Sequence, residues 1–184
     1  MRFFRSAAGI RSTHPWRRFA RNEKGATAIE FGLIAVPFIG LMFAILEIGL
    51  FFFAQQTLET AVQMSARLIR TGIAQEQNLN SSDFKQTICD RVGVLFRCDN
   101  LKIDVRLIDT FDSSNPPLPL DENGKLIDQD FIYTPGHGGE IVLVRVFYEW
   151  PSLTKGIYFS LANTGSGKYL MVATAAFKNE PFPW

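Results

Sequence analysis

Cysteine and histidine are both scarce in this chain of 184 residues, which contains two of each. The histidines are His14 and His137, and the first belongs to a basic amino-terminal stretch. A structural zinc site takes about four Cys or His ligands, so the sequence does not favour one. No nucleophile stands at a recognisable spacing from a base and its orienting group. We therefore expect neither an enzyme nor a bound cofactor or metal.

Two short segments match ligand-binding loops only in part. Residues 163–168 resemble a phosphate-binding loop, but Ala162 and Tyr169 stand where a glycine and a magnesium-binding hydroxyl are needed. Residues 121–124 resemble a fragment of a calcium loop, but Asp130 stands in place of the closing glutamate. We expect a turn in the first segment and no calcium site in the second.

Charge is distributed unevenly along the chain. Residues 1–25 carry seven basic side chains and one acidic one, whereas the whole chain has 19 basic and 18 acidic residues. A basic stretch directly before an apolar segment stays on the cytoplasmic side of a membrane. We interpret residues 1–25 as a cytoplasmic leader. A nucleic-acid-binding arm is less favoured, because no second basic patch accompanies it.

Charged side chains are almost absent from residues 31–54, where Glu47 is the only one. At ~1.5 Å per residue, 24 helical residues extend about 36 Å, which is enough to cross a bilayer with some tilt. A cleaved secretory signal has a shorter apolar core and a small-residue cleavage site after it. We expect a transmembrane helix that contacts lipid and stays in the mature protein.

Glu47 is costly within such a run unless it is protonated, paired or near water. The sequence leaves two interpretations open. Its carboxylate contacts a neighbouring helix within the membrane, or it lies at the outer interface.

The helical pattern continues beyond the apolar run. Apolar or small side chains recur every three or four residues, which predicts one helix over residues 26–75 whose outer part lies on a domain outside the membrane. The residues of this stripe are Leu58, Val62, Ser65, Ile69 and Ile73.

Residues 76–184 are expected to form a small periplasmic α+β domain. Asp83 with Gln86 three positions later predicts the start of a short helix. Three strands are expected, over residues 101–108, 141–150 and 169–177. In the first, Lys102, Asp104 and Arg106 are expected to point away from the core.

The fold class is therefore α+β, with a long amino-terminal helix on a small antiparallel sheet. The loop over residues 110–139 is long, and a short strand is expected in it near Phe131. It either binds a surface or covers the sheet, and the sequence does not decide between them.

Both cysteines, Cys89 and Cys98, follow the membrane segment. If the leader is cytoplasmic, they face an oxidising compartment, in which a disulfide is the default expectation. Two unpaired buried thiols are the alternative.

The junction between the leader and the helix resembles the processing motif of type IV prepilins. It consists of Gly25 followed by the sequence ATAIEF over residues 26–31. This version of the motif resembles the TadE/TadF pseudopilins of tight-adherence (Flp/Tad) pili. The cysteine pair, the strand over residues 138–146 and the closing segment over 177–182 also look TadE-like, so the resemblance extends over about residues 24–182.

The resemblance implies cleavage between Gly25 and Ala26 by a prepilin peptidase of the bacterial inner membrane. Cleavage frees the Ala26 amine, and Glu30 is then implied to pair with that amine of an adjacent subunit. Pairing of Glu30 with the amine of its own chain is the alternative. The implied partners are other Tad pilins and pseudopilins, together with the inner-membrane assembly platform.

Two features depart from the major pilins of such fibres. Those pilins are much shorter and usually have tyrosine after the glutamate, whereas this chain has Phe31 and a sizeable outer domain. We therefore expect a minor pilin that aids pilus initiation or tip assembly, and hence adhesion. The alternatives are an unprocessed single-pass envelope scaffold or sensor and, less favoured, a membrane-tethered periplasmic enzyme. The choice between TadE and TadF stays open.

Overall fold

The computed structural model describes residues 25–114, 116–151, 164–165 and 167–183. The chain divides into two compact units, Met1–Phe43 and Ala44–Trp184.

One α-helix, α2, extends over Ala26–Arg70, 45 residues including Pro37. In the amino-terminal unit, large apolar side chains between residues 29 and 43 of this helix are 48–73% exposed. By length and composition, α2 can cross a membrane, and it is the one such helix among the described residues. A surface of this kind is typical of a segment that lipid surrounds.

Gly72 ends the long helix. Its φ of +82° lies in the left-handed region, which glycine adopts without steric cost. A Cβ at this position would also lie 2.7 Å from the ring of Phe182. The helix expected over residues 26–75 is therefore divided into α2 and a short second helix, α3, over Ile73–Glu76.

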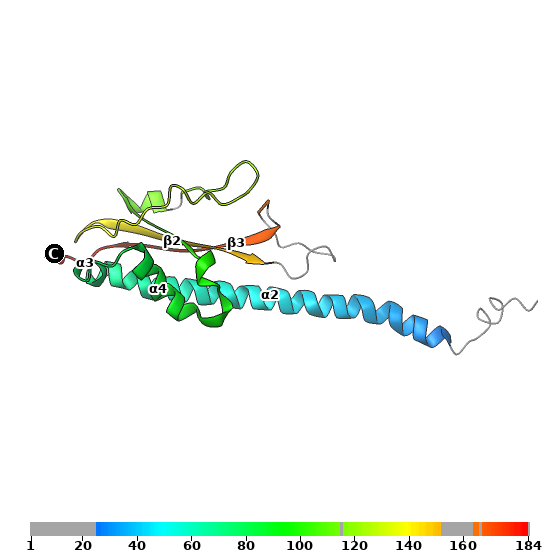
Figure 1. The fold of residues 1–184 in the computed structure, drawn as a ribbon. Helices are drawn as coiled ribbons and strands as arrows, with labels where there is room; N and C mark the ends of the chain where they lie inside the picture. The colour runs from blue at the N-terminus through cyan, green and yellow to red at the C-terminus, as the bar shows by residue number, and fades with distance from the viewer. Residues whose placement is uncertain (1–24, 115, 152–163, 166, 184) are drawn as a thin grey trace, which may run out of the picture. The chain divides into compact units, whose positions relative to one another are not determined.

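The carboxy-terminal unit contains a three-stranded antiparallel sheet in the order β1-β2-β3. The strands are β1 Lys102–Ile108, β2 Ile141–Pro151 and β3 Lys168–Lys178, within two residues of the predicted bounds. Residues 44–70 of α2 lie along one face of this sheet (Figure 1). The expected α+β class, a long helix on a small antiparallel sheet, is confirmed.

Strand β3 is aligned with the outer part of α2. The ring of Phe51 lies 4.4 Å from that of Tyr169 at the start of the strand. Farther along, the Gln63 side chain donates to the Thr174 carbonyl at 3.2 Å. At the far end, the Glu180 amide donates to the Arg70 carbonyl at 2.9 Å. The apolar core fills the space between the helix and the strand. Four residues of the predicted helical stripe are buried in it: Leu58, Val62, Ser65 and Ile69. The fifth, Ile73, is more exposed.

A third helix, α4, extends over Ser81–Val92 and buries Phe84, Ile88 and Val92, as the sequence predicts. Its start was assigned wrongly from the sequence. Asn80 is the N-cap, and Asp83 is the residue whose side chain accepts from the Asn80 amide at 3.1 Å. Asn80 and Asp83 thus form a reciprocal capping box.

The second face of the sheet is covered at Asp104, so the expectation that this side chain points outward to solvent is wrong. Asp104 is fully buried and lies directly opposite Arg145 in the β1–β2 register. Arg145 donates to Asp104 Oδ2 at 2.8 and 3.2 Å, and Arg106 donates to Oδ1 at 2.8 and 3.1 Å. Alternation of polar and apolar residues indicated an exposed face because it does not reveal a loop packed over that face.

That loop is the connection between β1 and β2, which crosses the second face (Figure 1). The ring of Phe131 stacks on the ring of Phe147 at 5.0 Å. Tyr133 forms an isolated parallel bridge with Val105, which is the counterpart of the short strand expected near Phe131. The sequence left two roles open for residues 110–139, binding a surface or covering the sheet. The part of the loop around Phe131 covers the sheet.

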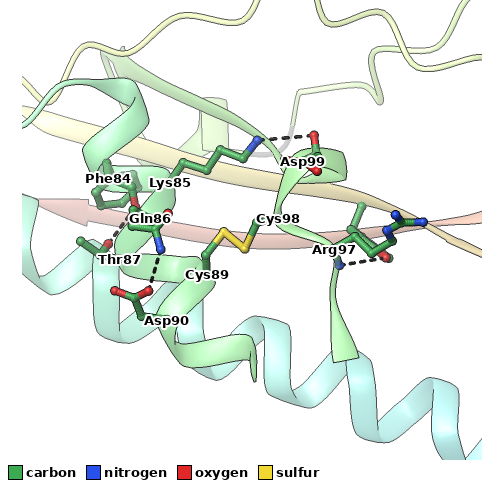
Figure 2. The surroundings of a disulfide bond; sticks show 10 residues. Phe84, Lys85, Gln86, Thr87, Cys89, Asp90, Arg97, Cys98 and Asp99 are labelled. Carbon is green, nitrogen blue, oxygen red and sulfur yellow. Dashed lines mark hydrogen bonds between the residues drawn. A yellow bond between two sulfur atoms is a disulfide. The ribbon is translucent and has the colours of Figure 1, made fainter. Parts of the chain in front are cut away.

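Cys89 and Cys98 form a disulfide, with their Cα atoms 5.7 Å apart. Figure 2 shows it joining α4 to the single turn η3, Cys98–Asn100. Between the two cysteines, the ring of Phe96 packs at 4.8 Å from that of Tyr148. The two cysteines are nine positions apart, and the bond therefore fixes the connection between them against the sheet just before β1 begins.

Substitution Asp104→Ala tests the buried ion pair. It leaves the Arg145 guanidinium buried without a counter-ion, so we expect the free energy of unfolding to fall by about 3–5 kcal/mol. Urea denaturation of the full chain in non-ionic detergent measures this. Lys102→Ala is the control, because its ion pair with Asp128 is more than 40% exposed on both sides and contributes at most about 1 kcal/mol. If both substitutions lowered the free energy of unfolding by the same amount, the buried ion pair of Asp104 would not be a major source of stability.

If the disulfide is present, maleimide should label no thiol in denatured protein before reduction. After reduction it should label two thiols. The double variant Cys89→Ser, Cys98→Ser should lose about 2–3 kcal/mol of unfolding free energy, since the closed loop is short. Labelling before reduction would refute the bond in the isolated protein.

Candidate functional site

The candidate site is the junction at the start of α2. Residues 1–24, which the sequence predicts to be most of the leader, lie outside the described residues. Gly25 is exposed, and no described atom lies within 4 Å of the position that a Cβ would take there. The helix begins at Ala26, so the peptide bond between these two residues lies at the end of the helix.

Glu30 and Phe31 are both exposed, and Phe31 is 73% exposed. Glu30 lies four residues after Ala26, about one helical turn or ~6 Å along the axis. A free amine at Ala26 would be within reach of Glu30 of its own chain and equally open to a second chain.

Glu47 belongs to the carboxy-terminal unit and is 6% exposed. It shares a helix face with Phe51 and Ala54, which are also buried, whereas Phe52 and Phe53 are more than 60% exposed. The carboxylate therefore lies on the side of α2 that the chain itself covers. This burial does not decide between the two earlier interpretations, and both stay predictions.

The partial motifs form turns where they are described. Asp121 Oδ1 accepts from the amides of Asn123 and Lys125 at 2.9 and 2.7 Å. Thr164 Oγ1 donates to the Lys168 carbonyl at 2.7 Å, directly before β3. Residues 162, 163 and 166 lie outside the described residues.

Two features were not predicted from the sequence: the ion pairs of Asp104 and an open cleft beside α3. The signal for the first was present. An aspartate and two arginines occupy alternating positions on two strands that were predicted to pair. The cleft brings together residues separated by about 60 positions, and no local pattern marks it.

A family model described as TadE-like protein matches residues 25–67. The match begins at the glycine of the junction and ends within the part of α2 that lies on the sheet. The resemblance of this segment to TadE-like proteins is thus confirmed. No curated protein and no solved structure matches the chain.

Proposed function

We propose that this chain, a TadE-like protein of the Tad pilus system, acts as a minor pilin processed at its amino terminus. It is inserted in the inner membrane through α2 and aids pilus initiation or tip assembly, and hence adhesion. The observation that carries this proposal is the coincidence of three features at one point. The family match, the start of α2 and the glycine at the end of the basic stretch coincide at residues 25–26.

Cleavage by a prepilin peptidase would act at the Gly25–Ala26 bond. Glycine suits a narrow catalytic cleft, because its backbone is free of a side chain. The exposed position of Gly25 supports this role. Helix formation from Ala26 onward would leave the leader as the part that the peptidase removes.

Glu30 would then pair with the free Ala26 amine of an adjacent subunit. A carboxylate at the edge of hydrocarbon gains from a positive partner and is costly when left alone. Its exposure on α2 supports contact with another chain. Such a pair would set the axial register of subunits in the pilus.

The membrane-embedded part of α2 would extend over about residues 27–46. Among the described residues up to Leu46, no large apolar side chain is less than 48% exposed. From Glu47 onward, one face of the helix is buried by the chain and the other, with Phe52 and Phe53, stays exposed. Twenty helical residues extend about 30 Å, which matches the hydrocarbon thickness. The outer domain would then begin about two turns before the end of the apolar run at Ala54, and Glu47 would lie near the periplasmic interface.

We also propose a structural and not a catalytic role for the outer domain. The buried Asp104 pairs with the buried Arg145 and with the partly buried Arg106. The two arginines also donate to the Pro117 and Asp130 carbonyls at 3.4 and 3.3 Å, and these bonds hold the loop on the sheet.

Intact-mass measurement of the membrane-purified protein tests processing. In cells with active prepilin peptidase, we expect an amino terminus at Ala26. Gly25→Val should retain the leader, whereas Gly32→Val, at another glycine with open space around it, should be processed normally. A terminus at Met1 in the unsubstituted protein would instead support the unprocessed scaffold or sensor.

Glu30→Ala tests the assembly step separately. The variant should be cleaved normally but be missing from sheared pilus fractions, because the register-setting pair is lost. Glu59→Ala is the matched control, an exposed carboxylate on the outer part of the same helix. Incorporation of Glu30→Ala at the level of the control would rule out the pairing.

A further inference from the structure

The connection between the two cysteines carries a fully exposed apolar side chain. It contains the single turn η2, Gly93–Leu95, which is followed by Phe96 and Arg97. Residues 93–97 form the tip of this disulfide-closed loop. Val94 in the tip is 104% exposed, more than any other large apolar side chain among the described residues. Single apolar residues are common on protein surfaces, so the position and the neighbours of Val94 decide what its exposure means.

The tip lies at the end of the carboxy-terminal unit where the apolar run of α2 ends. The ring of Phe96 lies 5.8 Å from that of Trp150 on β2. Trp150 is directly opposite Tyr169 in the β2–β3 register, and the ring of Tyr169 lies 4.4 Å from that of Phe51 on α2. This row of aromatic residues places the tip near the level of Phe51.

This level is that of the lipid headgroups if α2 is embedded as proposed above. Phe51 follows Leu46, the last residue of the proposed embedded part, by about 7.5 Å along the helix. Headgroups extend about 5–7 Å beyond the hydrocarbon core on each side of a bilayer. Tryptophan and tyrosine are typical of this boundary, and Trp150 and Tyr169 supply one of each.

Two exposed arginines flank Val94, Arg91 in the last turn of α4 and Arg97 in the tip. Among the described residues, no carboxylate forms an ion pair with either guanidinium. Arg91 and Phe53 of α2 line one depression of about 240 Å³. Figure 2 shows the Arg97 side chain extending away from Cys98 and from α4. Both cations are therefore available to a group outside the chain.

Two carboxylates belong to the same stretch, Asp90 and Asp99. Asp90 Oδ1 accepts from Gln86 Nε2 at 2.7 Å, one turn nearer the start of α4. Asp99 lies beside Lys85, whose ammonium donates to the Asp99 carbonyl at 3.5 Å (Figure 2). Both aspartates thus contact residues nearer the start of α4, and the charged side chains that flank Val94 without an opposite charge are the two arginines.

We propose that the tip is a second membrane contact, with Val94 at the apolar boundary of the periplasmic leaflet and Arg91 and Arg97 on phospholipid phosphates. A guanidinium pairs with a phosphate through two parallel N–H···O bonds, while its aliphatic stem stays on apolar surface. Apolar side chains accompanied by cationic ones are typical of segments that lie in the interface. This inference rests on the proposed membrane placement of α2.

A second contact gives the disulfide a further role. α2 alone leaves the outer domain free to rotate about the axis of the helix. Contact at the tip fixes this rotation, and the bond between Cys89 and Cys98 holds the tip in one place on the domain. The same side of the outer domain then always faces the bilayer.

Lipid photo-crosslinking tests the proposal. The full chain, with p-benzoylphenylalanine in place of Val94, is reconstituted in nanodiscs of phosphatidylethanolamine and phosphatidylglycerol, and intact-mass measurement detects adducts. We expect a lipid adduct at this position. The same replacement of Ile73, an exposed β-branched side chain in α3 at the far end of the domain, should give none. Replacement of Phe43, which is 62% exposed within the proposed embedded part, is the positive control.

The outcomes separate the tip from the membrane placement of α2. A lipid adduct at Phe43 without one at Val94 would overturn the tip contact alone, whereas no adduct at either position would overturn both proposals. Equal yields at Val94 and Ile73 would show that the tip has no preference for lipid and would overturn the contact. An adduct at Val94 with the mass of a second protein chain would overturn lipid as the occupant.

Charge variants test the two arginines. With the crosslinker at Val94, the double variant Arg91→Gln, Arg97→Gln should lower the yield of lipid adduct at least about fivefold, because each arginine is attracted to an anionic phospholipid surface. Arg67→Gln, at an exposed arginine on α2 outside the tip, should leave the yield unchanged. Circular dichroism confirms that each variant is folded. An unchanged yield in the folded double variant would refute phosphate binding by these arginines.

Discussion

The rest of the structure depends on one constraint, the need to cover the apolar surface of α2 along its whole length. Up to Leu46, the large apolar side chains of the helix are exposed. Between Ala54 and Ile69, one stripe is buried against the sheet and α4. Because apolar surface is stable only out of water, the second part requires the outer domain and the first part requires lipid or other helices.

The outer domain is small, and it gains a second buried layer from its longest loop. The pairing of Asp104 with Arg145 holds this loop through further hydrogen bonds, such as that from Arg145 to the Pro117 carbonyl at 3.4 Å. The second face is thereby covered around Asp104 and Arg145, whereas Thr174 and Ala176 of β3 stay exposed on it. The disulfide fixes the remaining connection between α4 and β1. A domain of this size depends on such links, because its single core is limited.

Sequence reasoning located the elements well but misjudged some of their surroundings. The strands, the buried face of α4 and the cysteine pair followed from periodicity and compartment. The prediction that Asp104 points outward to solvent is wrong. Alternation along β1 shows that the two faces of the strand differ, but it does not show whether each face is covered. The cap of α4 was placed three residues late, since Asn80 and Asp83 both suit a helix start and only the backbone geometry decides between them.

The sequence by itself determined the junction at Gly25, the apolar helix that follows and the stripe that binds it to a sheet. Each of these features is a pattern among residues that are close together in the sequence. Only the tertiary structure decided that Glu47 is covered, that Asp104 is buried with Arg145, and that Gln75, Tyr133 and Glu140 meet around one cleft. These arrangements bring together residues far apart in the chain, and packing alone sets their distances.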